Sequence, residues 1–444
     1  MSINSAMLAG VSGLAANSSA LAAISDNIAN VNTVGYKDNG INFETLVTGE
    51  EGNTTGSAGG VLSSASQQVT SQGTPTQTSS PTDLAISGQG MFITEPTSGA
   101  VNSSTPILYT RAGSFTPDST GFLKNAANLY LLGWPTNAQG VVQTGSSVSS
   151  LSPINITNVN ATVSPTTTVS LNSANLPSDS AIQPAVTSLP YAAGDMASGA
   201  ITPDQTIPIK VSDSLGNEHE LDLELVKTGS DTWGAEVVSN PTSDTGSTGN
   251  AIAQGNIVFN TDGSLNAAST TLPTSFTIPW AASLGVTPNQ PITLNLGANG
   301  AKGTTGISQD GSSFAAGTAI SDGTPFGNLT GVTIGNTGDV TATFDNGTSR
   351  VIAQVAMATF ANEDGLNAVT GDAYQATFNS GTASINAPGS GGAGTLASNA
   401  LESSTVDLSK EFTNLIITQR AYTASSKVIT AADNMTQDLL AIIR

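Results

Sequence analysis

Ionisable side chains that could carry out chemistry are scarce in this sequence, and they gather at one place. Only 10% of the 444 residues are Asp, Glu, Lys or Arg, and the chain contains one histidine, His219, and no cysteine. Around His219, acidic residues alternate with leucines over residues 218–225. Carboxylate oxygens and imidazole nitrogens are ligands of divalent cations, so a metal site is the chemistry to consider first.

The alternation in residues 218–225 nevertheless predicts a half-buried strand. A period of two places the acidic side chains on one face of a strand and the apolar ones on the other. Alternate residues on one face lie about 6 to 7 Å apart, so their oxygens do not converge on a single ion. We therefore expect a solvated strand face, no metal and no other cofactor. The four acidic residues of this face are Glu218, Glu220, Asp222 and Glu224.

Other catalytic patterns are also missing from the sequence. A Ser-His-Asp triad would have to use His219, and no Gly-x-Ser-x-Gly elbow supplies a nucleophile. The glycines around Lys302 do not form a phosphate loop, and Gly88-Gln89-Gly90 lacks the third glycine of a dinucleotide fingerprint, so both predict turns. Hydrolysis by a carboxylate pair stays open on composition, because any two of 32 acidic residues could meet. With only 5% aromatic residues to form sugar platforms, we expect no enzyme.

The charge balance and the hydropathy pattern exclude several kinds of partner. The chain has 32 acidic and 11 basic residues, a net charge of −21 that repels nucleic acid and anionic membranes. No run of about 18 apolar residues is present, so no transmembrane helix or membrane insertion is expected. The first lysine is Lys37, and the basic start of a cleaved secretory signal is therefore not expected.

Both ends of the chain have the composition and the periodicity of helices. Residues 1–34 contain no proline, and residues 395–444 contain neither glycine nor proline. Large apolar residues recur every seven positions in both segments, which is the spacing of a coiled coil. In the first segment the alternate heptad row is weaker, because it includes Gly10 and Asn17. Asp407 is placed to cap the amino end of the second helix.

The second terminal helix is apolar on more than one face, which favours several helix partners over one. Such surface more often mediates self-association than a hairpin within a monomer, although the monomeric hairpin is an alternative. The residues that we predict at a polymerisation interface are Met7, Leu14, Leu21, Ile28, Leu408, Phe412, Leu415, Tyr422, Ile429, Leu439 and Ile443.

Between the helical ends the sequence predicts β-structure, and hence an α+β fold that is mainly β. Short alternating runs are separated by turn dipeptides, and the clearest hairpin joins Val340–Phe344 to Arg350–Phe360 through Asp345-Asn346-Gly347. If the terminal helices pair as a coiled-coil stem, they enclose nested β-barrel or sandwich domains. The predicted divisions are a terminal helical domain (1–34 and 401–444), linkers (35–74 and 387–400), an inner β domain (75–150 and 326–386) and an outer β domain (151–325).

Motifs at both ends resemble those of the bacterial flagellar rod and hook protein family. Residues 25–37 read Ser-Asp-Asn-Ile-Ala-Asn-Val-Asn-Thr-Val-Gly-Tyr-Lys, and residues 406–416 read Val-Asp-Leu-Ser-Lys-Glu-Phe-Thr-Asn-Leu-Ile. Residues 83–94 and 109–115 are similar to the inner β domain of the same family. One departure is Thr405, where the family usually has Asn.

The resemblance implies a structural subunit of the flagellum outside the cell, and the long insertion 151–325 points to the hook. It implies polymerisation of the chain with itself into a helical, flexible tube that transmits torque from rod to filament. Further implied partners are the distal rod protein, the hook–filament junction protein, the hook cap and the type III export gate. Export without a cleaved signal is implied too, with Phe43 and Val47 as the export-gate element.

Three alternatives are less well supported by the sequence. A distal rod subunit or a flagellin-like axial subunit would share the plan of helical ends around β domains. A β-rich surface adhesin would explain the acidic, cysteine-free middle, but it leaves the two terminal heptad patterns without a purpose. For Phe43 and Val47, ordinary packing is the alternative to export recognition.

Overall fold

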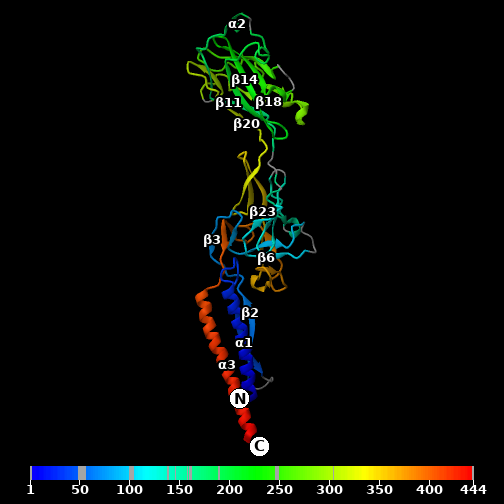
Figure 1. Ribbon diagram of the computed structural model, residues 1–444, viewed down its shortest axis with the longest axis vertical. Coiled ribbons are helices and arrows are strands. Elements are labelled where there is room, and N and C mark those ends of the chain that lie inside the picture. Colours follow the sequence, from blue (N-terminus) through cyan, green and yellow to red (C-terminus); the bar gives the residue numbers. More distant parts are fainter. Residues whose placement is uncertain are drawn as a thin grey trace. The chain divides into compact units, whose positions relative to one another are not determined.

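The computed structural model describes residues 3–48, 57–99, 105–137, 140–145, 147–157, 159, 163–188, 191–245, 250–303 and 305–442. The chain divides into two compact units. Unit 1 comprises residues 1–159, 329–343 and 349–444, and unit 2 comprises residues 160–328 and 344–348. Figure 1 shows the helices of the two chain ends, blue and red, within unit 1. The fold is mainly β with one helix at each end, which confirms the predicted fold class.

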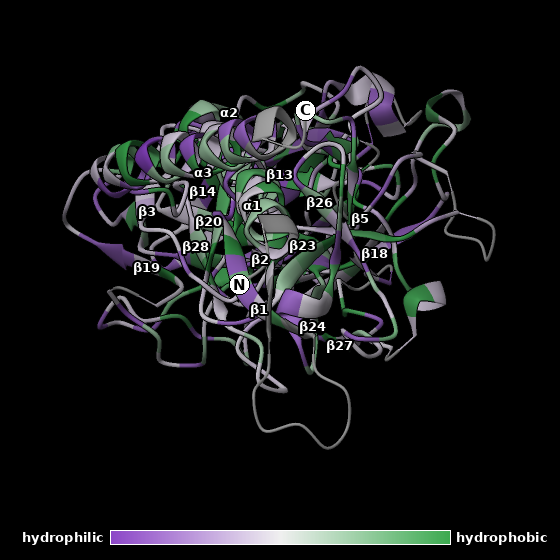
Figure 2. Cartoon of the chain, turned by 90° about the horizontal axis from the view of Figure 1, so that it is seen from below, coloured by the Kyte–Doolittle hydropathy of each residue, from purple (hydrophilic) through white to green (hydrophobic). Residues whose placement is uncertain are grey.

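The terminal helices are shorter than the predicted terminal helical domain of residues 1–34 and 401–444, because residues 30–34 form turns and Ala400–Glu402 form strand β29. Helix α1 spans Ile3–Ala29, and α3 spans Leu408–Ile442. Oδ1 of Asp407 accepts the backbone N–H groups of Ser409 and Lys410 at 2.9 and 3.2 Å, which confirms the predicted N-cap. Figure 2 shows hydrophobic and hydrophilic residues interspersed along α3.

Small side chains hold α1 and α3 together within one chain. A Cβ atom added to Gly10 would lie 2.9 Å from Cγ1 of Ile429, and one added to Gly13 would lie 3.2 Å from Oγ of Ser425. Ala16 and Ala20 are also buried on α1. The intramolecular contact therefore uses small residues, including Gly10 of the weak heptad row. The stronger heptad row of α1 is only half-buried, because the backbones of α1 and α3 lie so close that its larger side chains are placed beside the contact and not within it. That row comprises Met7, Leu14, Leu21 and Ile28.

A β-hairpin packs on α1 where the sequence predicted a linker. Strand β1, Asn39–Thr48, pairs antiparallel with β2, Ser57–Gln67, and Ser12 Oγ of α1 accepts the N–H of Val61 at 3.1 Å. The linker prediction for residues 35–74 is therefore wrong in this part. Strand β2 consists mostly of Gly, Ala and Ser, so the alternation that marks a strand is hard to detect there, whereas Ile41 and Phe43 of β1 do alternate with polar residues.

The second predicted linker, residues 387–400, also contains ordered β-structure. Strand β28, Thr395–Ser398, pairs with β4, Leu84–Ser87, and the N–H of Gly389 donates to the carbonyl of Gly394 at 2.8 Å. The glycines of this segment form turns against the inner sheet, because glycine adopts the positive φ values that these turns need.

The β-part of unit 1 is a curved sheet in the order β21-β22-β23-β9-β5-β6-β26-β25. Its core contains Leu84, Phe92 and Phe115, none of which is exposed. The strands on this path are β5 Met91–Glu95, β6 Leu108–Thr110, β9 Tyr130–Pro135, β21 Leu329–Ile334, β22 Asp339–Phe344, β23 Ser349–Val355, β25 Asn367–Val369 and β26 Ala373–Gln375. The remaining strands of unit 1 are β3 Pro75–Gln77, β7 Thr116–Pro117, β8 Leu123–Lys124, β10 Ser152–Pro153, β24 Met357–Thr359, β27 Ser384–Asn386 and β29 Ala400–Glu402.

The predicted hairpin around Asp345-Asn346-Gly347 forms between β22 and β23. Its second strand is shorter than predicted, because β23 ends at Val355 and the chain changes partners. The following strand β24 pairs with β5 and β27 instead of continuing along β22.

Unit 2 is a sandwich of two four-stranded sheets. One has the order β13-β14-β15-β16 and the other β17-β18-β11-β20, and both contribute to a single hydrophobic core. Trp233 and Leu223 from the first sheet and Ile278 from the second are not exposed at all. Its strands are β11 Thr168–Asn172, β12 Ala174–Pro177, β13 Gln205–Ser212, β14 Glu218–Gly229, β15 Thr232–Asn240, β16 Ala253–Val258, β17 Ser275–Ile278, β18 Gln290–Asn295, β19 Ile307–Asp310 and β20 Thr318–Ser321, with helix α2 at Pro184–Ser188.

Strand β14 has the alternation that residues 218–225 predict. Leu221, Leu223 and Leu225 are buried, and the acidic side chains between them are more exposed. His219 is buried with its ring 4.4 Å from that of Trp280, and its two nitrogens lie 3.0 and 2.6 Å from carboxylate oxygens of Asp213 and Asp244. Among the described residues, no group of three or more His, Asp or Glu residues could hold a metal ion.

We predict that replacing the cap residue, Asp407→Ala, weakens the first turn of α3 by about 1 kcal/mol, because two backbone N–H groups lose their acceptor. Amide hydrogen exchange of residues 409–412 would measure the change. The control is Asn434→Ala, an exposed position in the same helix. Equal exchange in both variants would contradict the capping role.

Candidate assembly interface

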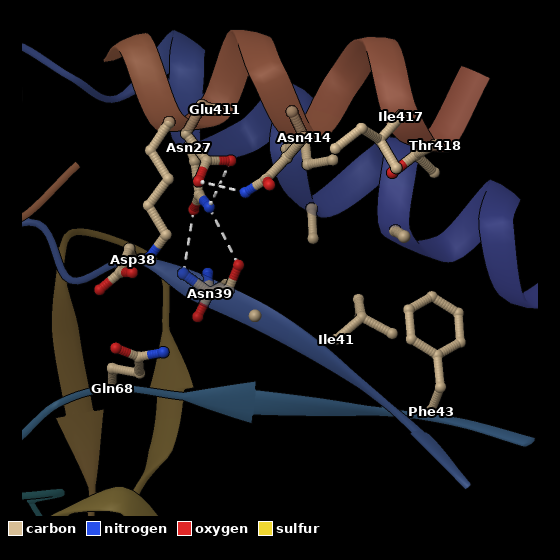
Figure 3. A pocket seen from close by; sticks show the side chains of 15 residues that line it. Asn27, Asp38, Asn39, Ile41, Phe43, Gln68, Glu411, Asn414, Ile417 and Thr418 are labelled. Carbon is tan, nitrogen blue, oxygen red and sulfur yellow. Dashed lines mark hydrogen bonds between the residues drawn. The ribbon is translucent and has the colours of Figure 1, made fainter. Parts of the chain in front are cut away.

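The two terminal motifs meet at Asn27, the most connected side chain of the stem (Figure 3). Its Nδ2 donates to the carbonyl of Asn39 at 2.9 Å and to Oε2 of Glu411 at 3.3 Å. Its Oδ1 accepts the N–H of Asn39 at 3.0 Å and the hydroxyl of Tyr36 at 3.2 Å. Asn27 is only 2% exposed, so one buried amide connects α1, β1 and α3.

The segments that flank the helices are also bonded to each other through Thr405. Its Oγ1 accepts the N–H of Asp38 at 2.9 Å and donates to Oδ1 of Asp38 at 3.0 Å. The N–H of Thr405 donates to the carbonyl of Tyr36 at 3.1 Å. A threonine hydroxyl both donates and accepts, and here it bonds to both the N–H and the carboxylate of Asp38.

A buried network of four charged side chains joins the stem to the inner sheet. Lys37 Nζ lies 2.6 Å from Oε1 of Glu402, and Arg111 Nη1 lies 3.4 Å from Oε2 of the same carboxylate. Arg111 Nη2 lies 4.0 Å from Oε2 of Glu363. Burial lowers the pKa of Lys37, an effect that the Glu402 carboxylate opposes. Two cations and two anions compensate one another in an environment that excludes water.

The Glu402 carboxylate is held by more than its two cationic partners. Its Oε1 accepts the N–H of Gly73 at 2.9 Å, and its backbone carbonyl accepts the N–H of Gly35 at 2.9 Å. Gly35 has a φ of +74°, and an added Cβ would lie 2.7 Å from the backbone of Arg111 and Ala112. Only glycine fits this crossing, which explains its place in the amino-terminal motif.

Large apolar side chains are exposed on the outside of the stem. Leu8 and Val11 of α1 are 64% and 54% exposed, and Phe412 and Ile417 of α3 are 49% and 60% exposed. A groove of about 260 Å³ runs between α1, β1 and α3. Figure 3 shows Asn27 and Glu411 at one part of this groove and Ile41, Phe43 and Ile417 at another. Surface of this kind on several elements marks an interaction site.

The residues predicted at a polymerisation interface divide into three groups. Leu408, Phe412 and Tyr422 are exposed. Leu439 and Ile443 have side chains outside the described part of the chain. The others are half-buried: Met7, Leu14, Leu21, Ile28, Leu415 and Ile429.

The two residues predicted as an export-gate element lie on β1. Phe43 is 52% exposed. The backbone of Val47 pairs with Ala58 of β2, and its side chain lies outside the described residues.

The sequence analysis missed Asn27, Tyr36 and Glu411 as connecting residues, together with the four charged residues. Asn27, Tyr36 and Lys37 belong to the quoted amino-terminal motif, from which only the family resemblance was inferred. The sequence offers no sign that Arg111 and Glu402 meet, because they are 291 positions apart. From a single sequence, a polar residue in the amino-terminal motif predicts a contact but does not identify the partner.

Helix α1 differs from the expectation that no segment is apolar enough to cross a membrane. Residues Ser5–Ala29 are long and apolar enough to do so by length and composition. The expectation rested on an uninterrupted apolar run, whereas this helix reaches the same average through alanines with serines between them. Helices of soluble proteins and signal sequences have the same character, so this feature carries no membrane assignment.

Comparisons with known protein families agree with this architecture. Residues 7–37 match the model of the flagella basal body rod protein, and residues 397–442 match the carboxyl-terminal model of the flagellar basal body rod FlgEFG proteins. Residues 175–324, within unit 2, match the D2 domain of the flagellar basal body protein FlaE. Paired terminal helices with these motifs therefore define an axial protein of the bacterial flagellum.

Full-length relatives identify the family within this class. The flagellar hook protein FlgE of Caulobacter vibrioides is 36% identical over an alignment of 598 positions that covers 100% of both chains. Those of Brucella melitensis and Salmonella typhimurium are 32% and 31% identical and cover 96% and 97% of this chain, and 96% and 98% of their own length. The chain belongs to the flagellar hook protein FlgE family. This is a structural family, with no known enzymatic activity.

We predict that Glu402→Gln lowers the free energy of unfolding by about 3 to 5 kcal/mol, because it leaves buried cations without a compensating charge. Urea unfolding of the full chain would measure the loss. The matched control is Glu218→Gln, whose ion pair with Lys210 is well exposed and whose loss should change little. A double variant with Lys37→Met should recover part of the loss. If Glu402→Gln proved as mild as the control, the network would not stabilise the stem.

Proposed function

We propose that this chain is the subunit of the flagellar hook and that it polymerises through its terminal helices into a flexible tube that transmits torque from rod to filament. The observation that carries the proposal is full-length identity of 36% to a flagellar hook protein. The exposed apolar surface on α1, β1 and α3 supports the same conclusion, because a stem that stayed monomeric would leave it in water.

Assembly buries this surface between neighbouring copies. Transfer of apolar surface out of water contributes about 25 cal/mol per Å², so several side chains such as Phe412 and Ile416 together offset the entropy of association. The half-buried row of α1 and the exposed Leu408, Phe412 and Tyr422 of α3 belong to this interface, together with the other residues that the sequence predicts there. One contact repeated between different patches of identical subunits builds a helix of subunits.

Torque transmission requires stiffness within a subunit and adjustable contacts between subunits. The stem and the inner sheet share the buried charges of Lys37, Glu402 and Arg111, and a buried pair of this kind is costly to break. In contrast, only 10% of residues are charged, so contacts between subunits depend little on specific ion pairs. Neutral Ser, Thr and Asn side chains could exchange hydrogen bonds at low cost as subunits slide past each other.

The remaining predictions concern domains and partners. We propose that the β-part of unit 1 is the inner domain and unit 2 the outer domain of the polymer. The partners are further copies of the chain, the distal rod protein, the hook–filament junction protein, the hook cap and the type III export gate. The chain would leave the cell through that gate without loss of a signal peptide, with Phe43 and Val47 as the recognition element. Exposure of Phe43 on β1 supports this role.

We predict that Phe412→Lys, in an exposed position of α3, abolishes hook assembly while the chain stays folded, because a charge cannot be buried between copies without a partner. Electron microscopy with antibody against residues 163–188 and 191–245 would show label on a short curved segment beside the cell for the wild type and none for the variant. The control is Leu215→Lys, equally exposed in unit 2. Label along whole filaments, or normal segments in the variant, would contradict the proposal.

We predict that Phe43→Ala reduces the amount of chain exported severalfold, because the export gate loses its aromatic contact. Immunoblotting of culture supernatant against cell extract would measure it. Leu62→Ala is the control, since Leu62 is similarly exposed on β2, in register with Glu44. Normal export combined with defective assembly would instead assign Phe43 to packing.

A further inference from the structure

One aromatic side chain of the inner sheet is fully exposed. Phe378, in the loop between β26 and β27, has a relative exposure of 100%. The nearby core phenylalanines behave in the opposite way: Phe92 and Phe115 are fully buried and meet edge to face at 5.3 Å. Single exposed apolar residues are ordinary on protein surfaces, so exposure alone assigns no role to Phe378.

The loop that carries Phe378 is held in one conformation by hydrogen bonds. The N–H of Thr377 donates to Oγ of Ser380 at 2.9 Å, and Oγ1 of Thr377 accepts the N–H of Asn379 at 3.1 Å and that of Ser380 at 3.2 Å. Thr377 Oγ1 also donates to the carbonyl of Gly365 at 2.6 Å, which fixes the loop to the chain before β25. Ser380 is completely buried. These hydrogen bonds hold the backbone on both sides of Phe378, and the ring itself lies in solvent.

A pocket in the same unit has room for an aromatic ring. Its volume is about 430 Å³, and its walls are made mostly of small or apolar residues. An apolar cavity of about 150 Å³ is enough to hold a benzene molecule. Phe378 does not fill this pocket in its own chain, because it is fully exposed. The residues that shape the pocket include Val34, Ala112, Ala126, Ala127, Gly371 and Asp372.

We propose that Phe378 of one copy inserts into the pocket at Val34, Ala126 and Gly371 of a neighbouring copy. The inference rests on the proposed self-assembly and adds a contact between inner domains to the one between terminal helices. Phe378 does not line the pocket of its own chain, so a contact that repeats in one direction along a row of subunits would leave a free Phe378 at one end of the row and a free pocket at the other. An aromatic anchor in a preformed pocket is the usual source of strong binding at protein interfaces.

Charge favours a second copy as the occupant. The chain carries a net charge of −21, so two copies repel each other wherever acidic residues face one another. Residues 373–401, which contain Phe378, include no Asp, Glu, Lys or Arg. Among the lining residues only Asp372 is acidic, and burial raises the pKa of its carboxyl group. The loop of Phe378 and the pocket are thus surfaces at which two copies can meet without strong repulsion.

The pocket must also stay open to accept a side chain, and Gly371 keeps it open because it has no side chain of its own. Gly371 has a φ of +94°, and a Cβ atom there would lie 2.6 Å from Cβ of Ala127. A larger residue would be strained and would close the space beside Ala127. Ala126, in contrast, is exposed and can be enlarged without strain on the core. This difference makes Ala126 the position from which to block the pocket.

Photo-crosslinking of assembled hooks tests the contact directly. The full chain carries p-benzoylphenylalanine in place of Phe378, and hooks are irradiated before peptide mapping. The expected result is a ladder of covalent oligomers in which position 378 is joined to residues 33–34, 112–114, 125–127 or 371–372. The same probe at Val141, which is 57% exposed in unit 1, should give no adduct on these residues. Adducts elsewhere on the chain, on another protein, or none at all would overturn the proposal.

Substitutions supply a second test on the full-length chain. Phe378→Ser and Ala126→Trp should each raise the critical concentration for polymerisation about tenfold or more, as expected for loss of a buried aromatic anchor. The combined variant should be no worse than either single variant, because both remove one contact. Val141→Ser and Ala126→Ser are the controls and should leave the value unchanged. If both test variants polymerise as the wild type does while Phe412→Lys does not, the Phe378 contact is refuted and the proposed function stands.

Discussion

The stem depends on charges that are buried together far from water. Lys37 follows α1, Glu402 precedes α3 and Arg111 lies beside the inner sheet, so their ion pairs fix where three parts of the chain meet. An uncompensated charge in such a place costs several kcal/mol. Loss of any one of the charged partners would therefore destabilise the place where the three parts meet. Asn27 adds a neutral connection of the same kind between α1, β1 and α3. These two sets of contacts hold the helices in a defined relation to the inner sheet, while their outer faces stay free for neighbouring copies.

The sequence predicted the elements whose signals are local. The start of α3 follows from the side-chain cap at Asp407, and the turn Asp345-Asn346-Gly347 determines its own hairpin. The alternation around His219 likewise identified a strand. Each of these signals is contained in a few neighbouring residues, which is why a single sequence reveals it.

Contacts between distant segments were harder to predict. The β1–β2 hairpin was mistaken for a linker, because β2 consists mostly of Gly, Ala and Ser and its packing on α1 leaves no local pattern in the sequence. The pairing of α1 with α3 uses Gly10 and Gly13, which a search for large apolar residues treats as gaps. The partners of Asn27 and Glu402 depend on the complete fold. For the assembly residues, the sequence identified Phe412 and Leu408 as apolar positions, and the structure adds that they are exposed.

The closing contact between Lys37 and Glu402 spans 365 positions of the chain, and this has a consequence for the order of folding. Closing a long loop costs entropy, and contacts between distant residues form slowly. The sheet β13-β14-β15-β16 of unit 2 pairs strands that follow one another along the chain, so we expect it to fold while the ends are still apart. The stem forms only when the last segment is present. A chain interrupted during synthesis or secretion thus has no completed stem, and we expect such incomplete molecules not to enter the polymer.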